Sequence, residues 1–494
     1  MSDQHTVPTY SLGQPSRRTG LGGLSMKTTA VIGGGFMLFL LMIISGQGLI
    51  GFTVVLPITV LAAVLITLTW QGRSIAQVIQ LKWQAFERRS KGEDFYIAGP
   101  SSKIPGGSWR MPGIAARTEI AESTDANGAD YAVVIDRPRR RATVFFDTQL
   151  SGQTAMTQGE RDQITASWGR WLAMLSLTGD IDSASVTVGS RPATGELLTK
   201  EVASIVHDDA PEIARRIQIE AAQVLRGGLA EMEAHVAVTF KIHSAGADDF
   251  EFLSQINTRL PGLYESLAWA GMQASPMDEN MLVARIHSMI NPAAELDFEE
   301  LMVEGKSHGI SWDDCGPSVA WVDGDVWHHE QVASVSWEMA DAPRSTFEDT
   351  LLAPLLMPHE RIERKRVTMV YRPYEAGTGA SRVEAEHQDA MVGVNSSKKM
   401  ASAKAEMRLE HTDAARRAQA RGAQLGRVSL FVTATTSDID SLPRLRDDIR
   451  QQAAQCNLRL RTMTDQPDVG FMIAAGIGQT PWPKSSTASI TTAS

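Results

Sequence analysis

The sequence predicts an α+β protein that begins with a two-helix transmembrane hairpin and continues into mixed layers of sheet and helix. Two observations lead to this prediction. No charged residue occurs between Lys27 and Arg73, and this stretch is nearly all apolar. From about residue 116 onward, short runs typical of strands interleave with runs at helical spacing, which indicates packed layers of sheet and helix.

The apolar stretch, residues 28–72, is too long for one membrane crossing, since about 20 apolar residues suffice. Small and polar residues at Gly46-Gln47-Gly48 favour a turn, so the two helices are expected at 28–46 and 50–70. An export signal is the alternative, because two arginines precede the apolar segment. That segment is, however, far longer than the apolar core of about 7–15 residues in a signal peptide.

Basic residues flank the apolar stretch on both sides and do not occur in its central turn. The positive-inside rule therefore predicts a two-helix protein of the inner or plasma membrane with both termini in the cytoplasm. Trp70 and Trp83 suit the membrane interface on that side. The flanking basic residues are Arg17, Arg18, Lys27, Arg73, Lys82, Arg88, Arg89 and Lys91.

Two less regular segments surround the hairpin. Residues 1–27 are polar and rich in Gly and Ser, and they are expected to form a flexible cytoplasmic tail. Residues 73–115 are predicted to hold a juxtamembrane helix and a Gly/Pro-rich connector. The helix is amphipathic and basic, so it could lie along the membrane surface or continue the second crossing. Its apolar positions are Ile75, Val78, Ile79, Trp83 and Phe86.

Residues 116–375 are predicted to form a cytoplasmic α+β domain, compatible with ferredoxin-like units whose strand order the pattern leaves open. A basic turn, Asp136–Arg141, joins the first two strands. Helices are expected near 164–175, 211–227, 249–270 and 346–356. Strands are expected at Tyr131–Ile135, Ala142–Phe146, Ser183–Val188, 234–242, 281–288, Val319–Trp327, Val332–Trp337 and Val367–Tyr371.

Residues 376–483 are predicted to contain a long charged helix and a small α+β unit. The helix corresponds to 379–424, which is rich in Ala, Arg, Lys and Glu. The unit after it has a strand at Val428–Ala434, a helix at Leu442–Gln455 and a strand at Leu458–Leu460. The Ser/Thr-rich segment 484–494 is expected to be a disordered tail.

Composition limits the function. The net charge of −10 argues against a dedicated nucleic-acid binder, whose domain would be basic. Two basic clusters, 137–141 and 361–366, are better interpreted as solvated faces than as phosphate sites. The two cysteines, Cys315 and Cys456, lie far apart and are typical of buried thiols in a reducing compartment.

The most suggestive motif is Gly305-Lys306-Ser307, which matches the end of a phosphate-binding loop. A complete loop needs a glycine five residues before Gly305, but that position holds Glu300. Glu299 and Glu304 add negative charge where a phosphate would bind. The motif therefore does not predict an ATPase.

Other motifs are equally incomplete. Asp and His residues are clustered at 323–330, with Asp313, Asp314 and Cys315 upstream. Their spacing does not match that of a known metal-binding motif. Asp323-Gly324-Asp325 is typical of a turn. Gly309–Asp313 lacks the closing glycine of a nucleophile elbow, and Gly377-Thr378-Gly379 lacks the third glycine of a dinucleotide fingerprint. The sequence thus assigns no catalytic, cofactor-binding or metal-ligating residue, and no cofactor.

The hairpin with its basic flanks resembles the small PrgI-like inner-membrane subunits of conjugation machines. The loop Pro105–Gly113 and the strands after it resemble an actinobacterial membrane-protein family of integrative conjugative elements. The later part, with the Val367–Tyr371 and Val428–Ala434 strands around the charged helix, is similar to the non-ATPase N-terminal region of type IV secretion ATPases.

This resemblance implies a non-catalytic inner-membrane scaffold of a conjugative or type IV secretion-like machine that transfers DNA or protein. Its implied partners are the lipid bilayer, a separately encoded ATPase, other membrane subunits of the machine and further copies of the chain, without sequence-specific binding of nucleic acid. The alternatives are a core membrane subunit of a type VII (ESX-like) secretion system and a membrane-anchored enzyme with an unrecognised site.

Overall fold

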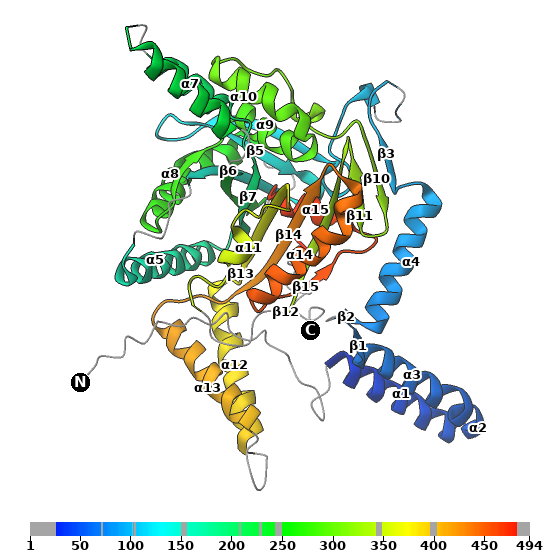
Figure 1. Cartoon of the computed structure of the whole chain (residues 1–494). Helices are drawn as coiled ribbons and strands as arrows, with labels where there is room; N and C mark the ends of the chain where they lie inside the picture. Colours follow the sequence, from blue (N-terminus) through cyan, green and yellow to red (C-terminus); the bar gives the residue numbers. More distant parts are fainter. Residues whose placement is uncertain are drawn as a thin grey trace.

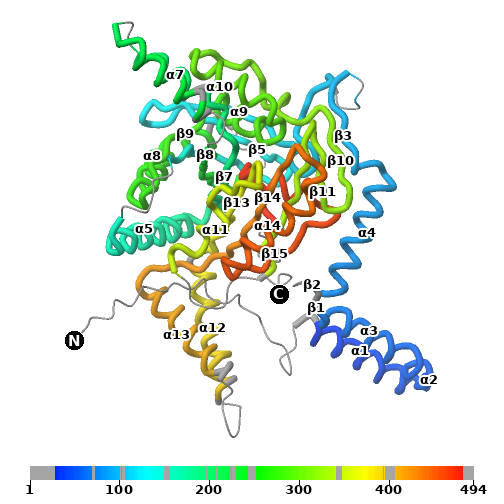
Figure 2. Tube along the Cα trace, in the orientation of Figure 1, coloured from blue at the N-terminus to red at the C-terminus, as the bar shows by residue number. Residues whose placement is uncertain are grey.

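The computed structural model describes residues 26–70, 73–100, 102, 105–149, 156–206, 209–226, 230–242, 249–341, 348–395 and 403–481. Most of the expected N-terminal tail and all of the expected tail 484–494 lie outside these ranges. Figures 1 and 2 show a large sheet flanked by helices, with an apolar helical hairpin set apart from it and joined to it through one helix, α4.

The hairpin consists of α1 (Met26–Ile44) packed against α2 (Gly48–Ile50), the π-helical turn η2 (Gly51–Val55) and α3 (Leu56–Thr67). Gly46, at φ 80°, makes the turn, as predicted. The π-helical turn lies where Pro57 has no N–H to donate to the carbonyl of Thr53.

Within the described residues, one helix, Gly48–Thr67, is long and apolar enough to cross a membrane. Its 20 residues span about 30 Å at about 1.5 Å per residue. The apolar part of α1, Thr28–Ile44, is shorter than this. The structure therefore supports one candidate membrane span, and the expected pair of spans is not confirmed.

The next helix, α4 (Ile75–Lys91), is separate from the apolar helix. The strands β1 (Thr69–Trp70) and β2 (Arg73–Ser74) lie between α3 and α4 and pair with each other. Ser74 caps α4 by accepting a hydrogen bond from the Gln77 backbone N–H, and the Gln77 side chain accepts one from the Ser74 N–H. This capping box starts a new helix, so α4 does not continue α3.

In the described part of the chain, thirteen strands form one sheet in which all pairs are antiparallel. Their order is β3-β10-β11-β12-β14-β13-β7-β8-β6-β5-β4, with β15 beside β12 and β9 beside β6. The strands are β3 (Phe95–Ile97), β4 (Thr118–Thr124), β5 (Asp130–Asp136), β6 (Arg141–Gln149), β7 (Ile181–Pro192), β8 (Ala230–Lys241), β9 (Gln273–Pro276), β10 (Val319–Asp323), β11 (Val326–His329), β12 (Val332–Asp341), β13 (Arg364–Pro373), β14 (Gly426–Thr436) and β15 (Arg459–Thr462).

The two halves of the sheet repeat one topology. The segments from β4 to α9 and from β10 to α15 have the same order of elements. Each begins with three consecutive paired strands, followed by a helix, a strand, two helices and another strand. Each ends with a helix, a short strand that pairs with the third strand, and a final helix. The central pair β7–β13 joins the halves. The helices are α5 (Gln158–Leu177), α6 (Glu196–Ile205), α7 (Glu212–Arg226), α8 (Asp249–Trp269) and α9 (Glu279–Ile290), matched by α11 (Ala353–Leu356), α12 (Ala376–Asn395), α13 (Ala403–Ala420), α14 (Leu442–Gln455) and α15 (Pro467–Ala474), with α10 (Glu295–Val303) between the halves.

Helices cover both faces of the sheet. On one face, α5 and α8 pack over the first half and α11 and α14 over the second. On the other face, α9 and α15 share a core with both halves. The helical pairs α6–α7 and α12–α13 project from opposite ends of the molecule, because each pair follows one strand of the antiparallel centre (Figure 2). Both expected cytoplasmic units, 116–375 and 376–483, contribute strands to this one sheet.

The mixed helix-and-sheet class is confirmed, together with most of the expected strands, but three local expectations fail. The strand expected at 281–288 is part of helix α9. Asp278 caps the N-terminus of this helix, because its side chain accepts a hydrogen bond from the Met281 N–H at 2.7 Å. In place of one long charged helix there are two, α12 and α13, which fold back so that Glu384 pairs with Arg416 at 3.2 Å. Of the helix expected at 346–356, the structure describes residues 348–356, and among these only Ala353–Leu356 is α-helical.

Candidate functional site: an acidic cavity at the strand ends

A cavity of about 1110 Å³ opens where β6, β7 and β8 meet helices of both layers. Strand residues 147–149, 191 and 231–234 form its floor, and α9 and α10 form one wall. The opposite wall comes from Arg161 of α5 and from residues 349–357 around α11. Figure 1 shows α9 and α10 at the end of the domain away from the apolar hairpin.

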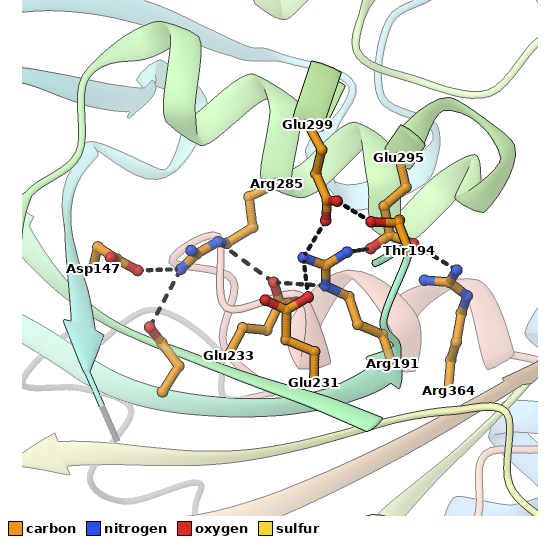
Figure 3. A network of polar contacts seen from close by, with 10 residues as sticks. Asp147, Arg191, Thr194, Glu231, Glu233, Arg285, Glu295, Glu299 and Arg364 are labelled. Carbon is orange, nitrogen blue, oxygen red and sulfur yellow. Dashed lines mark hydrogen bonds and ion pairs between the residues drawn. The ribbon is translucent and has the colours of Figure 1, made fainter. Parts of the chain in front are cut away.

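Arg191, near the end of β7, lies at the centre of the charged floor (Figure 3). The register of β7 and β8 places it directly opposite Glu231, with which it pairs at 2.8 Å. Its guanidinium also pairs with Glu299 at 2.9 Å and with Glu295, both on α10, and Glu233 lies 3.8 Å from its Nε. One cation therefore faces four carboxylates.

Burial and this charge imbalance shift the nearby pKa values. Burial acts to lower the pKa of Arg191, but the surrounding carboxylates outweigh it and raise that pKa above its usual value. Burial raises the pKa of Glu231, and repulsion from Glu299, Glu233 and Glu295 adds to this effect against the attraction of Arg191. The pocket floor is thus short of positive charge.

Two further arginines extend the network shown in Figure 3. Arg285 of α9 pairs with Asp147 of β6 at 2.7 Å. Arg364 of β13 pairs with Glu295 at 2.6 Å, which links the second half of the sheet to the cavity floor. Over the whole lining, seven Asp and Glu residues face four Arg and Lys residues. The cavity favours a ligand that brings positive charge.

The cavity lining also has an apolar part. Four methionines belong to it, and all four are exposed: Met232, Met281, Met302 and Met357. Phe298, Leu301, Leu352 and Leu356 are further apolar lining residues. Methionine side chains adapt to different apolar partners, and Met-lined grooves are used to hold amphipathic helices. Within the described residues, no group of three or more His, Cys, Asp or Glu side chains could hold a metal ion.

The Gly305-Lys306-Ser307 motif lies at the C-terminal end of helix α10, not between a strand and a helix N-terminus. Gly305 has φ 67°, and Lys306 pairs with Glu304 at 2.8 Å. The carbonyl end of a helix repels phosphate, so this geometry does not form a phosphate-binding loop. Lys306 nevertheless contributes to the lining of the cavity.

The acidic and histidine cluster at 323–330 does not converge. Gly324, at φ 62°, makes the turn between β10 and β11, as predicted. Asp325 pairs with Arg446, and His328 stacks on Trp321 with 4.7 Å between ring centroids. His329 is buried, and its Nδ1 lies 2.6 Å from the carbonyl oxygen of Ile290.

The two basic clusters form separate ion pairs and ring contacts, and the prediction that both are solvated faces is wrong, because Arg141, Lys365 and Arg366 are buried. In the first, Arg139 pairs with Asp136 at 2.7 Å and Arg141 with Asp182 at 2.9 Å. In the second, Arg361 pairs with Asp448, while Arg366 lies buried over the ring of Phe471, 4.3 Å from its centroid. Cys315 and Cys456 are both buried, as predicted, and both are free thiols.

Sequence reasoning missed the cavity and its floor. Two local signals were present, namely the carboxylates of Glu231 and Glu233 on one side of a strand and those of Glu295 and Glu299 one helical turn apart. Neither pattern shows that both pairs meet Arg191. No protein-family model and no curated protein matches this chain.

Proposed function

We propose that this chain is a membrane-anchored docking subunit without catalytic chemistry of its own, working in a conjugative or type IV secretion-like transfer machine. The observation that carries the proposal is the junction between anchor and domain. Helix α4 follows the apolar hairpin and is tied to the sheet domain through Arg88–Asp468 at 2.9 Å and Lys82–Asp465 at 2.7 Å. A large folded domain is thereby held beside an apolar anchor.

The cavity supplies the docking place in this proposal. Its acid-rich floor and Met-lined walls suit an amphipathic segment that presents an apolar face and basic side chains. The elements that form it lie away from the hairpin, so a partner in the cytoplasm could reach it (Figure 1). In keeping with the resemblance of the sequence, we propose that this partner is a separately encoded ATPase and that both termini of the chain are cytoplasmic.

A matched pair of methionine substitutions tests docking. The full chain in detergent is mixed with the purified ATPase encoded beside its gene, and the dissociation constant is measured. Met302→Lys places a charge on the cavity wall at a position 57% exposed. Binding should weaken by about tenfold or more, since replacing a well-packed apolar side chain at the centre of an interface costs about 1–3 kcal/mol. Met407→Lys, 56% exposed on α13, should leave binding unchanged.

Equal binding by the two variants, or no binding by the unaltered chain, would contradict docking at the cavity. ATP turnover by the purified chain that disappears in Lys306→Ala would contradict a non-catalytic role.

A further inference from the structure

Helix α4 has two different faces. Val78 and Leu81 are half-buried and Ala85 is buried on the face that meets the domain. Ile79, Trp83 and Phe86 follow one another at i, i+4 and i+7, which puts them together on the opposite face. The helix therefore carries apolar residues on two opposite sides, and the domain covers only one of them.

Three basic side chains of α4 tie the helix to the domain. Arg88 pairs with Asp468, Lys82 pairs with Asp465, and Arg89 lies 3.6 Å from Asp465. The preceding strand β2 is held as well, because its Arg73 pairs with Glu338 on β12. These contacts fix the rotation of α4 about its own axis, so the opposite face has a definite direction.

That opposite face is strongly apolar and open. Ile79 is 54% exposed, Trp83 70% and Phe86 68%. The two aromatic rings lie side by side, with 6.5 Å between their centroids. Leaving two large aromatic side chains in water forgoes the favourable free energy of burying their apolar surface.

The position of α4 in the chain indicates what covers this face. The candidate membrane span ends at Thr67, and α4 begins at Ile75, immediately after the paired strands β1 and β2. A helix so close to the end of a span lies near the bilayer surface. Trp and Phe on the apolar face of a surface helix favour this interface.

We infer that α4 lies on the bilayer surface with Ile79, Trp83 and Phe86 inserted among the lipids, while its basic face holds the sheet domain. Because α4 contacts both the lipids and the domain, it determines which side of the domain faces the membrane. This inference rests on the proposed membrane anchoring, and it deepens that proposal by assigning a second, interfacial contact with lipid.

Site-specific labelling tests the inference in the full chain. Cys315 and Cys456 are both fully buried, so an environment-sensitive fluorophore can be attached to single introduced cysteines. The positions are Leu61→Cys on the span, Phe86→Cys on the proposed inserted face, and Gln84→Cys, an exposed position of α4 turned away from that face, as the matched control. The protein is placed in nanodiscs of mixed phosphatidylcholine and phosphatidylglycerol, with or without a lipid-borne quencher.

We expect the lipid-borne quencher to act on labels at positions 61 and 86, with severalfold weaker quenching at position 84. A label at 86 that only a water-soluble quencher reaches, together with a lipid-quenched label at 61, overturns the inference and leaves the anchor standing; that outcome would assign the face to a protein partner. A label at 61 that is not quenched from the lipid overturns both the anchor and the inference.

Discussion

Two histidines on the sheet, His235 and His329, lie in surroundings that exclude their charged forms. Burial lowers the pKa of each to about 3. A histidine in the unfolded chain has a pKa of about 6.5. Between about pH 6.5 and 3, these two histidines are therefore protonated in the unfolded chain but neutral in the folded chain. Stability is thus fully present above pH 6.5 and falls as the pH drops, by up to about 1.4 kcal/mol per pH unit for each histidine.

His329→Gln should therefore flatten this pH dependence. The melting temperature of the chain in detergent, measured from pH 7.5 to pH 4.5, should fall less steeply for this variant than for the unaltered chain, and His235 should account for part of the remaining slope. His411→Gln, partly exposed on α13, is the control. An unchanged slope in His329→Gln would show that the buried imidazole is not the titrating group.

Among the elements, the end of α15 and the segment after it fit closely against the sheet. The carbonyl oxygen of Ala474 accepts a hydrogen bond from Thr368 Oγ1 at 2.6 Å, and Gly476, with φ 71°, lies beside Thr187. A Cβ at Gly476 would lie 2.4 Å from Thr187 Oγ1 and 2.5 Å from His235 Nε2. The chain can pass here only because this position has no side chain.

Gly476→Ala should consequently destabilise the fold by roughly 2–4 kcal/mol, from overpacking and from the left-handed backbone together. Gly305→Ala separates the two causes, since Gly305 also has positive φ but nothing lies within 4 Å of its added Cβ, so it should cost only about 1 kcal/mol. Equal losses in chemical unfolding would mean that the close approach at Gly476 relaxes freely.

For the whole molecule, the rigid connection between anchor and domain depends on a few ion pairs at one end of the sheet. Replacing both Asp465 and Asp468 by Asn removes the partners of Lys82, Arg88 and Arg89. Asn suits position 465, where φ is 65°. Hydrogen exchange of the α4 amides should become about tenfold faster, which corresponds to about 1.4 kcal/mol of lost stabilisation.

Membrane association of this double variant should persist, because the hairpin is unaltered. Asp447→Asn, which removes an exposed pair with Arg450 on α14, is the control and should leave the exchange of α4 unchanged. Unaltered protection of α4 in the double variant would show that apolar packing at Val78, Leu81 and Ala85 suffices to hold the helix.

The sequence by itself determined the local features of this protein. The uncharged apolar residues predict the hairpin, and alternation of apolar and polar residues predicts strands such as β5, β6 and β14. The turns at Gly46 and Gly324 follow from residue type. All of these features depend on neighbours within a few positions along the chain. It failed at α9, where the apolar residues Leu282, Val283, Ile286 and Ile290 fit a helix and a short strand almost equally well and only the Asp278 cap decides.

Only the tertiary structure decided the rest. The repeat of two half-sheets, the antiparallel pairing of β7 with β13 and the meeting of Arg191 with Glu295 all join residues about 100 or more positions apart. Periodicity along the chain carries no information about which strand lies beside which, and a buried ion pair forms only after that order is set. The cavity exists because of that order.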